Sequence, residues 1–402
     1  MSVLFTPVGK SDRKGLDPES EGAICHIIRN YTDIDTVVLY ISDELLAEDA
    51  KDPFPEYIHT VRPGLHVEYA KRPDLVDVHR FDAFYDDFGS ELTKISHESP
   101  DSPIYVNLTS GTAAMQSSLM VLCEVFHRKL IPLQVDNPQY NSSGNRCYEV
   151  QTKNFRRLII LENIKALIAQ YDYHGARELA TGVVSPESMQ LIEGAVDRYE
   201  LRSRQARKKL GHELSNELMG QTSPIGKCFE YLQYLSVLEK RAEWAGFVRG
   251  ADPATVGTLL CLVDAFTEFD RTELVKSGTV AVLNVEYVQG DPELKKYFKS
   301  AMEARSADKY IGWFPLTDIV RDRSRLFERD VIDAIERIGG LQRTRNRFVH
   351  NIEAVDVNAE KLAADWQAVW HTLLKAAAAK AEEVLPPWDS YNKLNETIIR
   401  SL

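Results

Sequence analysis

Short apolar segments alternate with helical segments over residues 1–152, and this alternation constrains the fold more than any other feature of the chain. Residues 36–41 read TVVLYI, the continuous apolar run expected of a strand buried on both faces of a parallel sheet. Strands that alternate with helices predict a Rossmann-like parallel α/β sheet. The predicted strands are Ser2–Thr6, Thr36–Ile41, His66–Ala70, Ile104–Leu108 and Leu130–Val135, and the predicted helices are Phe81–Ile95 and Thr112–Phe126.

Small polar residues follow two of these strands, the first and the fourth along the chain. In an open α/β sheet, ligands gather at the carboxyl ends of strands, where a glycine-containing turn exposes backbone N–H groups to anions. The hydroxyl and amide groups there can read a base or a ribose, although Thr109 or Ser110 can equally cap the following helix. Neither GxGxxG nor GxxxxGK[ST] occurs, which disfavours a dinucleotide cofactor and P-loop hydrolysis. The candidate ligand-binding residues are Gly9, Lys10, Ser11, Asn107, Thr109, Ser110, Gly111 and Thr112.

The rest of the chain is predicted to be all-α, because apolar residues recur at helical spacing from Phe155 onward. We expect three domains: a ligand-sensing domain over 1–152, a helical linker domain over 153–225 and a helical C-terminal domain over 226–402. The segment Thr279–Val288 is rich in β-branched residues and fits either a strand or a buried helix.

One predicted helix, Ser188–Leu210, carries a cluster of basic side chains. Such a cluster usually forms a solvated face, although it would also fit an RNA path. Trp366 and Trp370 lie four residues apart and are predicted to belong to the core or an interface rather than to a base-stacking platform. The basic residues of the cluster are Arg198, Arg202, Arg204, Arg207, Lys208 and Lys209.

The segment 345–350, RNRFVH, combines a permanent cation, an amide and a titratable imidazole. If it is helical, Asn346 and His350 lie on one face and Arg345 flanks that face. A guanidinium can hold a phosphate through paired hydrogen bonds, and an imidazole can move protons near neutral pH without a metal. Arg345, Asn346 and His350 are therefore candidate catalytic residues for phosphodiester chemistry.

The spacing of this motif does not identify it, because Arg207 and His212 repeat it and a basic helix end with a solvated histidine would look the same. Its surroundings favour a functional role. Residues 321–347 contain eight Arg and five acidic residues, a local charge of +3 in a chain of net charge −12, so a polyanion is least repelled there. We expect Gly339-Gly340 to end the preceding helix, Asp318–Ile338, and to place the motif near a helix N-terminus.

Composition excludes several classes of protein. With 44% hydrophobic and 27% charged residues the chain is ordinary in composition for a globular protein, and no apolar run approaches the ~20 residues that cross a bilayer. The first ten residues lack a secretion signal, so a cytoplasmic location is expected. Five widely spaced cysteines form no CxxC and indicate neither disulfides nor a zinc site, and Cys123 and Cys261 lie in apolar runs typical of the core. The acidic balance argues against general nucleic-acid coating.

The sequence resembles one family over essentially the whole chain. The resemblance rests on an N-terminal Rossmann-like domain with Asn-Leu-Thr-Ser-Gly-Thr, an all-helical middle and a C-terminal Arg-Asn-x-x-x-His. The family is the CRISPR-associated Csm-type accessory ribonucleases of type III systems, which join a CARF sensor domain to a HEPN nuclease domain. The resemblance implies that the CARF domain of a homodimer binds a cyclic tetra- or hexa-adenylate in a pocket lined by the two turns. It also implies that binding activates the HEPN domain to cut single-stranded RNA with Arg345, Asn346 and His350, without a metal or another cofactor. The chain departs from many members at Lys10 and at Ala113-Ala114, which leaves open the ring size and whether the sensor domain degrades its activator.

Metal-free RNA cleavage uses the substrate's 2′-hydroxyl as nucleophile. His350 would transfer the proton, and Arg345 would stabilise charge on the phosphate. Asn346 would orient His350 or the phosphate. One imidazole cannot readily serve as base and acid at opposite oxygens, which favours a composite site at a two-fold axis. The competing function is a non-catalytic cyclic-nucleotide sensor whose helical domain docks a protein partner. A third possibility, a Rossmann-fold nucleotide-dependent transferase, is disfavoured because the glycine fingerprint is missing. We expect no membrane partner and no stable complex with DNA.

Overall fold

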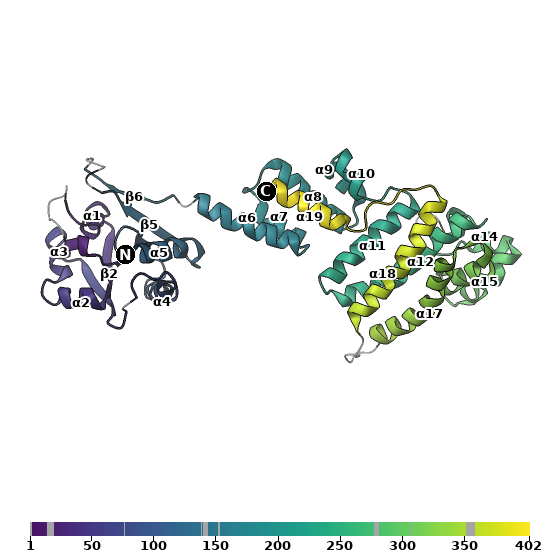
Figure 1. Ribbon diagram of the computed structural model, residues 1–402, viewed down its shortest axis with the longest axis horizontal. Coiled ribbons are helices and arrows are strands. Elements are labelled where there is room, and N and C mark those ends of the chain that lie inside the picture. Colours follow the sequence, from purple (N-terminus) through teal and green to yellow (C-terminus); the bar gives the residue numbers. More distant parts are fainter. Residues whose placement is uncertain are drawn as a thin grey trace. The chain divides into compact units, whose positions relative to one another are not determined.

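The computed structural model describes residues 2–13, 20–75, 77–137, 139, 144–151, 153–276, 281–306, 308–350 and 358–402, and of residues 153 and 348–350 it describes the backbone alone. The chain divides into two compact units, Met1–Leu158 and Ile159–Leu402, and each is treated by itself (Figure 1). Within the described ranges, no helix is long and apolar enough to cross a membrane.

The first unit is built on a six-stranded sheet in the order β3-β2-β1-β4-β5-β6. The first five strands in this order are parallel, and β6 pairs antiparallel with β5. The five predicted strands and the predicted parallel α/β sheet are confirmed, whereas the short edge strand β6 was not predicted. The strands are β1 Ser2–Pro7, β2 Ile34–Ser42, β3 His66–Arg72, β4 Ile104–Asn107, β5 Leu130–Val135 and β6 Cys147–Glu149.

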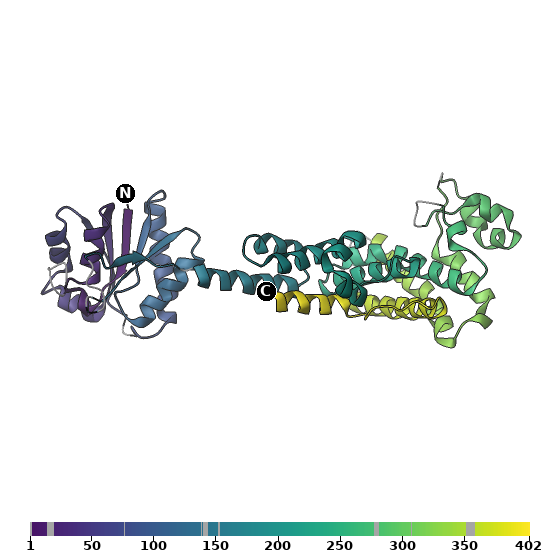
Figure 2. The same ribbon diagram turned by 90° about the horizontal axis from the view of Figure 1, so that it is seen from above.

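Helices cover both faces of this sheet, as Figure 2 shows. Successive side chains of a strand point to opposite faces, so Phe5 of β1 packs in one core with Phe88 of α4 while Leu4 packs in the other with Ile27 of α1. Both cores are apolar, which explains why the strand sequences read as continuous apolar runs rather than as alternating ones. The elements around the sheet are η1 Lys10–Arg13, α1 Ala23–Asn30, α2 Asp43–Asp49, α3 Phe54–Val61, α4 Asp82–Glu98 and α5 Ala113–Val125.

The strand order reverses between β1 and β4. From β1 the chain moves outward to β2 and β3, and then returns to add β4 and β5 on the other side of β1. The connections that leave β1 and β4 therefore turn to opposite faces and leave a crevice between them. This crevice is bordered by the two turns in which the sequence predicts a ligand site.

The second unit is helical throughout the part of it that the structure describes, apart from two isolated β-bridges. Helix α6 begins in the first unit and ends in the second. The helices are α6 Lys153–Ala169, α7 Tyr173–Ala180, α8 Pro186–Tyr199, α9 Ser203–Leu210, α10 His212–Leu218, α11 Pro224–Lys240, α12 Trp244–Phe266, α13 Arg271–Leu274, α14 Val285–Gly290, α15 Pro292–Glu303, α16 Trp313–Asp322, η2 Ser324–Leu326, α17 Arg329–His350, α18 Ala359–Lys380 and α19 Ser390–Ser401.

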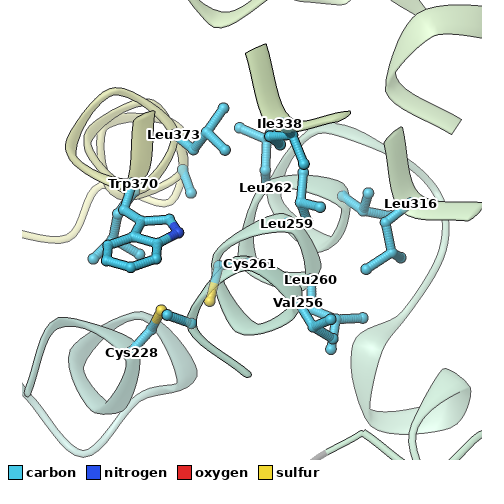
Figure 3. Packing of buried hydrophobic residues seen from close by; sticks show 14 of the residues in the cluster. Cys228, Val256, Leu259, Leu260, Cys261, Leu262, Leu316, Ile338, Trp370 and Leu373 are labelled. Carbon is cyan, nitrogen blue, oxygen red and sulfur yellow. The ribbon is translucent and has the colours of Figure 1, made fainter. Parts of the chain in front are cut away.

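One hydrophobic core of this unit surrounds α12, which packs against α11, α16, α17 and α18. Figure 3 shows Leu259 and Leu262 of α12 among side chains of the neighbouring helices. Trp366 and Trp370 of α18 are fully buried and stack with ring centroids 5.2 Å apart. The prediction that the two tryptophans belong to the core rather than to a base-stacking platform is confirmed.

A second core joins α6–α10 to the C-terminal helix α19. Ile164 of α6, Ile192 of α8 and Leu394 of α19 are all fully buried in it. The end of the chain therefore completes the core of the middle helices, although the sequence assigned it to the C-terminal domain alone. The domain boundaries drawn after 152 and 225 stay predictions.

The basic segment 188–210 is not one helix, so this prediction is wrong. The chain turns at Leu201, whose φ of 58° ends the helical path between α8 and α9. Arg198 is 1% exposed, and its Nε donates to Glu230 Oε2 at 2.9 Å, so it belongs neither to a solvated face nor to an RNA path. Arg204 is exposed, as the solvated interpretation expected.

The described part of the segment Thr279–Val288 forms neither a strand nor one continuous helix. Residues 279–280 lie outside the described residues, Val282 and Leu283 form isolated bridges, and Val285 begins α14.

The predicted helix break at Gly339-Gly340 is wrong. Helix α17 continues through both glycines to His350, and Ile335 and Ile338 before the glycines are fully buried in the core. The motif at 345–350 therefore lies at the C-terminal end of a long helix rather than near an N-terminus.

Candidate functional site

A buried hydrogen-bond network joins the two turns at the crevice. Asn107, fully buried at the end of β4, donates through Nδ2 to Thr6 Oγ1 at 2.9 Å and to Ser110 Oγ at 2.7 Å. Its Oδ1 accepts from the Thr109 N–H at 2.9 Å. Asn107 thus fixes the conformation of the turn after β4, and its amide is engaged within the protein.

Asp12 of η1 is the carboxylate at the centre of this network. It is 3% exposed, and it accepts from the Gly9 N–H at 2.8 Å and from the Ser110 hydroxyl at 2.8 Å. Burial raises the pKa of Asp12 to about 6, against the lowering effect of hydrogen bonds from Gly9, Ser110 and the start of α1. One side chain therefore ties the turn after β1, the turn after β4 and the first turn of α1 together.

The two turns approach each other through glycines. A Cβ at Gly9 would lie 3.1 Å from the Gly111 nitrogen, and one at Gly111 would lie 2.8 Å from Met115 Sδ and 3.0 Å from Pro7 Cβ. Gly111 also has a φ of +84°, which L side chains rarely adopt. Only glycine lets the backbones come this close, although the Gly9 N–H is already bonded to Asp12.

Thr112 joins the turn after β4 to helix α5. Its Oγ1 accepts from the Met115 N–H at 3.3 Å and so caps α5, and it donates to the Val78 carbonyl at 2.6 Å. Thr109 Oγ1 accepts from the Val135 N–H of β5 at 2.8 Å. The capping role foreseen for a hydroxyl residue of this turn falls to Thr112, rather than to Thr109 or Ser110.

A pocket of ≈ 170 Å³ opens above this network. Four of the eight predicted ligand-binding residues line it: Gly9, Lys10, Gly111 and Thr112. The pocket lining does not include the other four. Among these, Asn107 and Ser110 are buried, Thr109 is half-buried and Ser11 is exposed. Val8, Ser42, Glu44, Leu45, Val78 and Met115 complete the lining.

The sequence analysis missed Asp12, Ser42 and Glu44. Ser42 ends β2, the strand next to β1, so the rule that ligands gather at strand ends could have found it and the adjacent Glu44. Glu44 Oε1 lies 2.5 Å from Lys10 Nζ at the exposed rim of the pocket, where the hydrogen bond raises the pKa of Lys10. A ligand phosphate would compete with Glu44 for this lysine.

The second candidate site is the end of α17. Arg345 is half-buried, and its Nε donates to the Val248 carbonyl of α12 at 3.3 Å while its Nη1 donates to Asn346 Oδ1 at 3.1 Å. One turn earlier, the buried Gln342 donates to Asp252 Oδ1 of α12 at 3.1 Å. Two polar contacts with α12 therefore fix the rotation of α17 just before the motif.

The motif residues beyond Arg345 face outward or lie outside what the structure describes. Asn346 and Arg347 are exposed. The backbone of α17 extends to His350, so Asn346 and His350 are four helical residues apart, as predicted. The side chain of His350 lies outside the described residues.

Positive charge near the motif is concentrated at this helix end. Arg321 pairs with Glu336 at 2.9 Å, and Arg337 pairs with Asp365 at 2.7 Å. Among the described residues, no acidic side chain forms an ion pair with Arg343, Arg345 or Arg347. Within the same ranges, no group of three or more His, Cys, Asp or Glu side chains is arranged to hold a metal ion.

Models of one protein family match most of the chain in three consecutive segments. The Cas_Csm6 CARF domain matches residues 72–156, the CRISPR-associated protein Csm6 6H domain matches 150–199, and the Cas_Csm6 HEPN domain matches 219–399. The switch-point turn after β4 lies in the first match and the end of α17 in the third.

Curated relatives and a solved structure agree with these matches. The CRISPR system endoribonuclease Csm6 of Mycobacterium tuberculosis is 29% identical, with 100% of this chain and 98% of the relative covered. The protein of the same name from Enterococcus italicus is 24% identical, with 90% of each chain covered. The structure of Enterococcus italicus Csm6 bound to cyclic hexa-2′-fluoro-hexa-dAMP has the same fold, with a TM-score of 0.66, 18% identity and full coverage of both chains. The chain therefore belongs to the Csm6 family, with its CARF, 6H and HEPN domains in that order.

Proposed function

We propose that this protein is a metal-independent endoribonuclease of type III CRISPR defence that cleaves single-stranded RNA when a cyclic oligoadenylate binds its first unit. One observation carries the proposal: α17, inside the HEPN match, holds Arg345 against the Val248 carbonyl and continues as helix to His350. The relatives named CRISPR system endoribonuclease support the reaction class.

The chemistry follows from the residue types at the end of α17. The substrate's 2′-hydroxyl attacks the adjacent phosphorus, the bond to the 5′-oxygen breaks, and the products are a 2′,3′-cyclic phosphate and a 5′-hydroxyl. His350 transfers a proton, and Arg345, fixed at its Nε, presents its remaining N–H groups to the phosphate oxygens. Asn346, hydrogen-bonded to Arg345 Nη1, orients the guanidinium.

Two copies of this helix end form one active site in our proposal. The attacking and leaving oxygens lie on opposite sides of the phosphorus, so one imidazole cannot readily serve both in a single step. A two-fold dimer supplies a second His350 and a second Arg345. Arg343, Arg345 and Arg347, which form no ion pair with any described residue, would repel their counterparts in a partner subunit unless a polyanion lay between them. This fits a site completed by RNA.

The crevice between β1 and β4 is the proposed activator site. Gly9, Lys10, Gly111 and Thr112 would contact the ring, and Ser11 lies beside them on the exposed side of the first turn. Asn107, Thr109 and Ser110 would act by holding the turn after β4 in shape, because their side chains bond within the protein.

The size of the pocket also favours a dimer. At ≈ 170 Å³ it is smaller than the roughly 300–1,000 Å³ of a site for one drug-sized ligand, so one chain would hold only part of a ring of four or six nucleotides. A second copy across a two-fold axis would hold the rest. Activation then means that the ring binds one dimer arrangement better than another.

The experiment is an RNA-cleavage assay on purified full-length protein. Labelled single-stranded RNA is incubated alone, with cyclic tetra-adenylate and with cyclic hexa-adenylate, and binding of each ring is measured separately by calorimetry. We expect one ring to bind and to accelerate cleavage. A ring that binds without any cleavage would support a non-catalytic sensor, and the absence of both ring binding and cleavage would overturn the proposal.

A further inference from the structure

Two buried cysteines of the second unit face each other across a helix pair. Cys228 of α11 and Cys261 of α12 are 8% and 1% exposed. Figure 3 shows their sulfur atoms turned toward each other between the two helices, and the thiols form a hydrogen bond. The pair belongs to α11 and α12 and not to the end of α17, and the proposed reaction uses neither thiol.

The helices come close here because α12 presents small residues to α11. A Cβ at Gly250 would lie 2.4 Å from Leu235 Cδ2, and one at Gly257 would lie 3.7 Å from Cys228 Sγ. Side chains as short as cysteine can meet only where two helix backbones approach closely. A disulfide requires such an approach, because its Cα atoms usually lie within about 7 Å.

A guanidinium contacts this thiol pair. Arg271 Nη1 donates to Cys261 Sγ at 3.1 Å, and Thr258 Oγ1 lies 3.5 Å from Cys228 Sγ. The hydrogen bond with Cys261, together with Thr258 and Arg271, lowers the pKa of Cys228 despite its burial. The same hydrogen bond, together with burial, raises the pKa of Cys261 well above its usual range. Cys228 is also the thiol of the two that lines a pocket, so we take it as the nucleophile.

Cys228 is also accessible to a small reagent, whereas Cys261 lies behind it. A pocket of ≈ 600 Å³ between α11, α12 and the turn at Leu201 is lined by Cys228 and Arg271. The other three cysteines differ in this respect. Cys25, Cys123 and Cys147 are buried, burial raises the pKa of each to about 12, and none of them lines one of the pockets described above.

We propose that Cys228 and Cys261 are a modification site at which a small hydroperoxide forms a reversible disulfide between α11 and α12. The Cys228 thiolate attacks the distal peroxide oxygen and becomes a sulfenic acid, while the peroxide leaves as water or an alcohol. The Cys261 thiol then attacks the sulfenic sulfur, its proton leaves with the hydroxyl as water, and the sulfur–sulfur bond forms. Two thiols are oxidised and one peroxide is reduced, and a dithiol reductant reverses the change.

The cross-link would act on the helix that supports Arg345. Val248 and Asp252, the contacts of Arg345 and Gln342, both lie on α12, so fixing α12 to α11 fixes the support of the motif. A disulfide also restricts the unfolded chain and so stabilises the folded unit. The inference does not depend on the proposed nuclease activity, because its test counts thiols.

The test treats reduced full-length protein with hydrogen peroxide, quenches it with an alkylating reagent and maps the peptides by mass spectrometry. We expect Cys228 and Cys261 to be recovered as one cross-linked peptide pair that dithiothreitol separates. Cys228→Ser and Cys261→Ser should each abolish this pair, and Cys123→Ser, the buried control, should retain it. Because the map is read on the unaltered chain, the result stands even where a variant fails to fold.

Two results would overturn the inference. One is that both cysteines are fully alkylated when the peroxide-treated protein is unfolded and quenched. The other is oxidation of Cys228 to a sulfinic acid with Cys261 still free. As a second measurement, the unfolding midpoint of the second unit, followed by its tryptophans, should rise on the order of 5 °C on oxidation and return on reduction. No shift would contradict a cross-link between the two helices.

Discussion

Arg345 Nε donates a hydrogen bond to the Val248 carbonyl at 3.3 Å, which joins the motif helix α17 to the core helix α12. The contact uses one N–H group of the guanidinium and leaves others for a phosphate. Because Val248 belongs to the buried core around α12, the position of Arg345 is set by packing and not by its own flexible side chain.

Replacing Arg345 should therefore remove both a positive charge and the contact between α17 and α12. We expect Arg345→Ala to slow RNA cleavage on the order of 10²–10³-fold, because a group that stabilises charge on the phosphate is lost. Arg345→Lys should also cleave RNA more slowly. A lysine ammonium lacks the planar set of N–H donors that lets a guanidinium bond to the Val248 carbonyl and to a phosphate at once. His212→Ala is the matched control, because His212 follows Arg207 at the same spacing and is exposed. Equal losses in Arg345→Ala and His212→Ala would contradict the assignment.

Gly111→Ala should weaken activator binding. A left-handed conformation costs an L-residue about 1–2 kcal/mol, and the new Cβ would also press on Met115 and Pro7 in the turn. We expect the ring to bind about tenfold more weakly or worse, as measured by calorimetry. Gly182→Ala is the control, because Gly182 also has a positive φ, of +75°, but lies outside the activator pocket, so its substitution should leave ring affinity unchanged. Unchanged ring affinity in Gly111→Ala would remove this turn from the activator site.

Asp12 should make the stability of the first unit depend on pH. Its pKa is raised to about 6 in the folded state from an ordinary 3.8, so the folded state binds the proton more tightly than the unfolded state does. The contribution of Asp12 to the free energy of unfolding is therefore fully present below pH 3.8. It falls by about 3 kcal/mol as the pH rises through 6. Asp12→Asn should lack this loss.

Hydrogen exchange of the β1 and β4 amides measures the effect of Asp12, because all five tryptophans of the chain lie in the second unit and do not report on the first. The free energy of opening in the unaltered chain, relative to Asp12→Asn, should fall between pH 4 and pH 7. Identical pH profiles in the two proteins would show that Asp12 is not buried as a carboxylate.

Arg198→Ala should destabilise the second unit more than the substitution of any exposed member of the same basic cluster. Removing one partner of a buried ion pair leaves Glu230 uncompensated and costs about 3–5 kcal/mol. Arg204→Ala, the exposed control, should change the free energy of unfolding by less than about 0.5 kcal/mol. Urea unfolding followed by tryptophan fluorescence compares the two, and equal effects would contradict the structural role of Arg198.

The sheet of the first unit could be predicted because its strands are buried on both faces. Residues 36–41 are apolar throughout, and period and composition then agree on a strand. Helices α1 and α2 were missed because eight and seven residues give too few turns for a helical period to be recognised. The turns of the site could be located for a similar reason, since glycine and hydroxyl residues directly follow apolar strands.

The hydrogen-bond partners within the site could not be predicted. Nothing in the local sequence shows that Asp12 is buried, since its environment is made by Ser110, which lies 98 positions away in the chain. The same holds for Arg198, whose partner Glu230 lies on another helix. Spacing identifies residues of one helix face, whereas long-range pairs depend on how the elements pack.

The course of α17 shows packing overriding local propensity. A glycine in a helix interior costs about 1 kcal/mol relative to alanine, so two in succession predict a break. Ile335 and Ile338 before the glycines are fully buried, and Gln342 after them bonds to Asp252. Burial of an isoleucine side chain contributes about 1.5–3 kcal/mol, so these contacts outweigh the cost of the glycines.

The most direct test of the central claim is the cleavage of labelled single-stranded RNA by His350→Ala and by the unaltered protein, with activator ring and excess chelator present. The account predicts that the unaltered protein cleaves as fast with chelator as without it and leaves 2′,3′-cyclic phosphate ends. It also predicts that His350→Ala binds the ring normally and loses cleavage on the order of 10²–10⁴-fold. Cleavage that stops on metal removal, or that persists in His350→Ala, would contradict it.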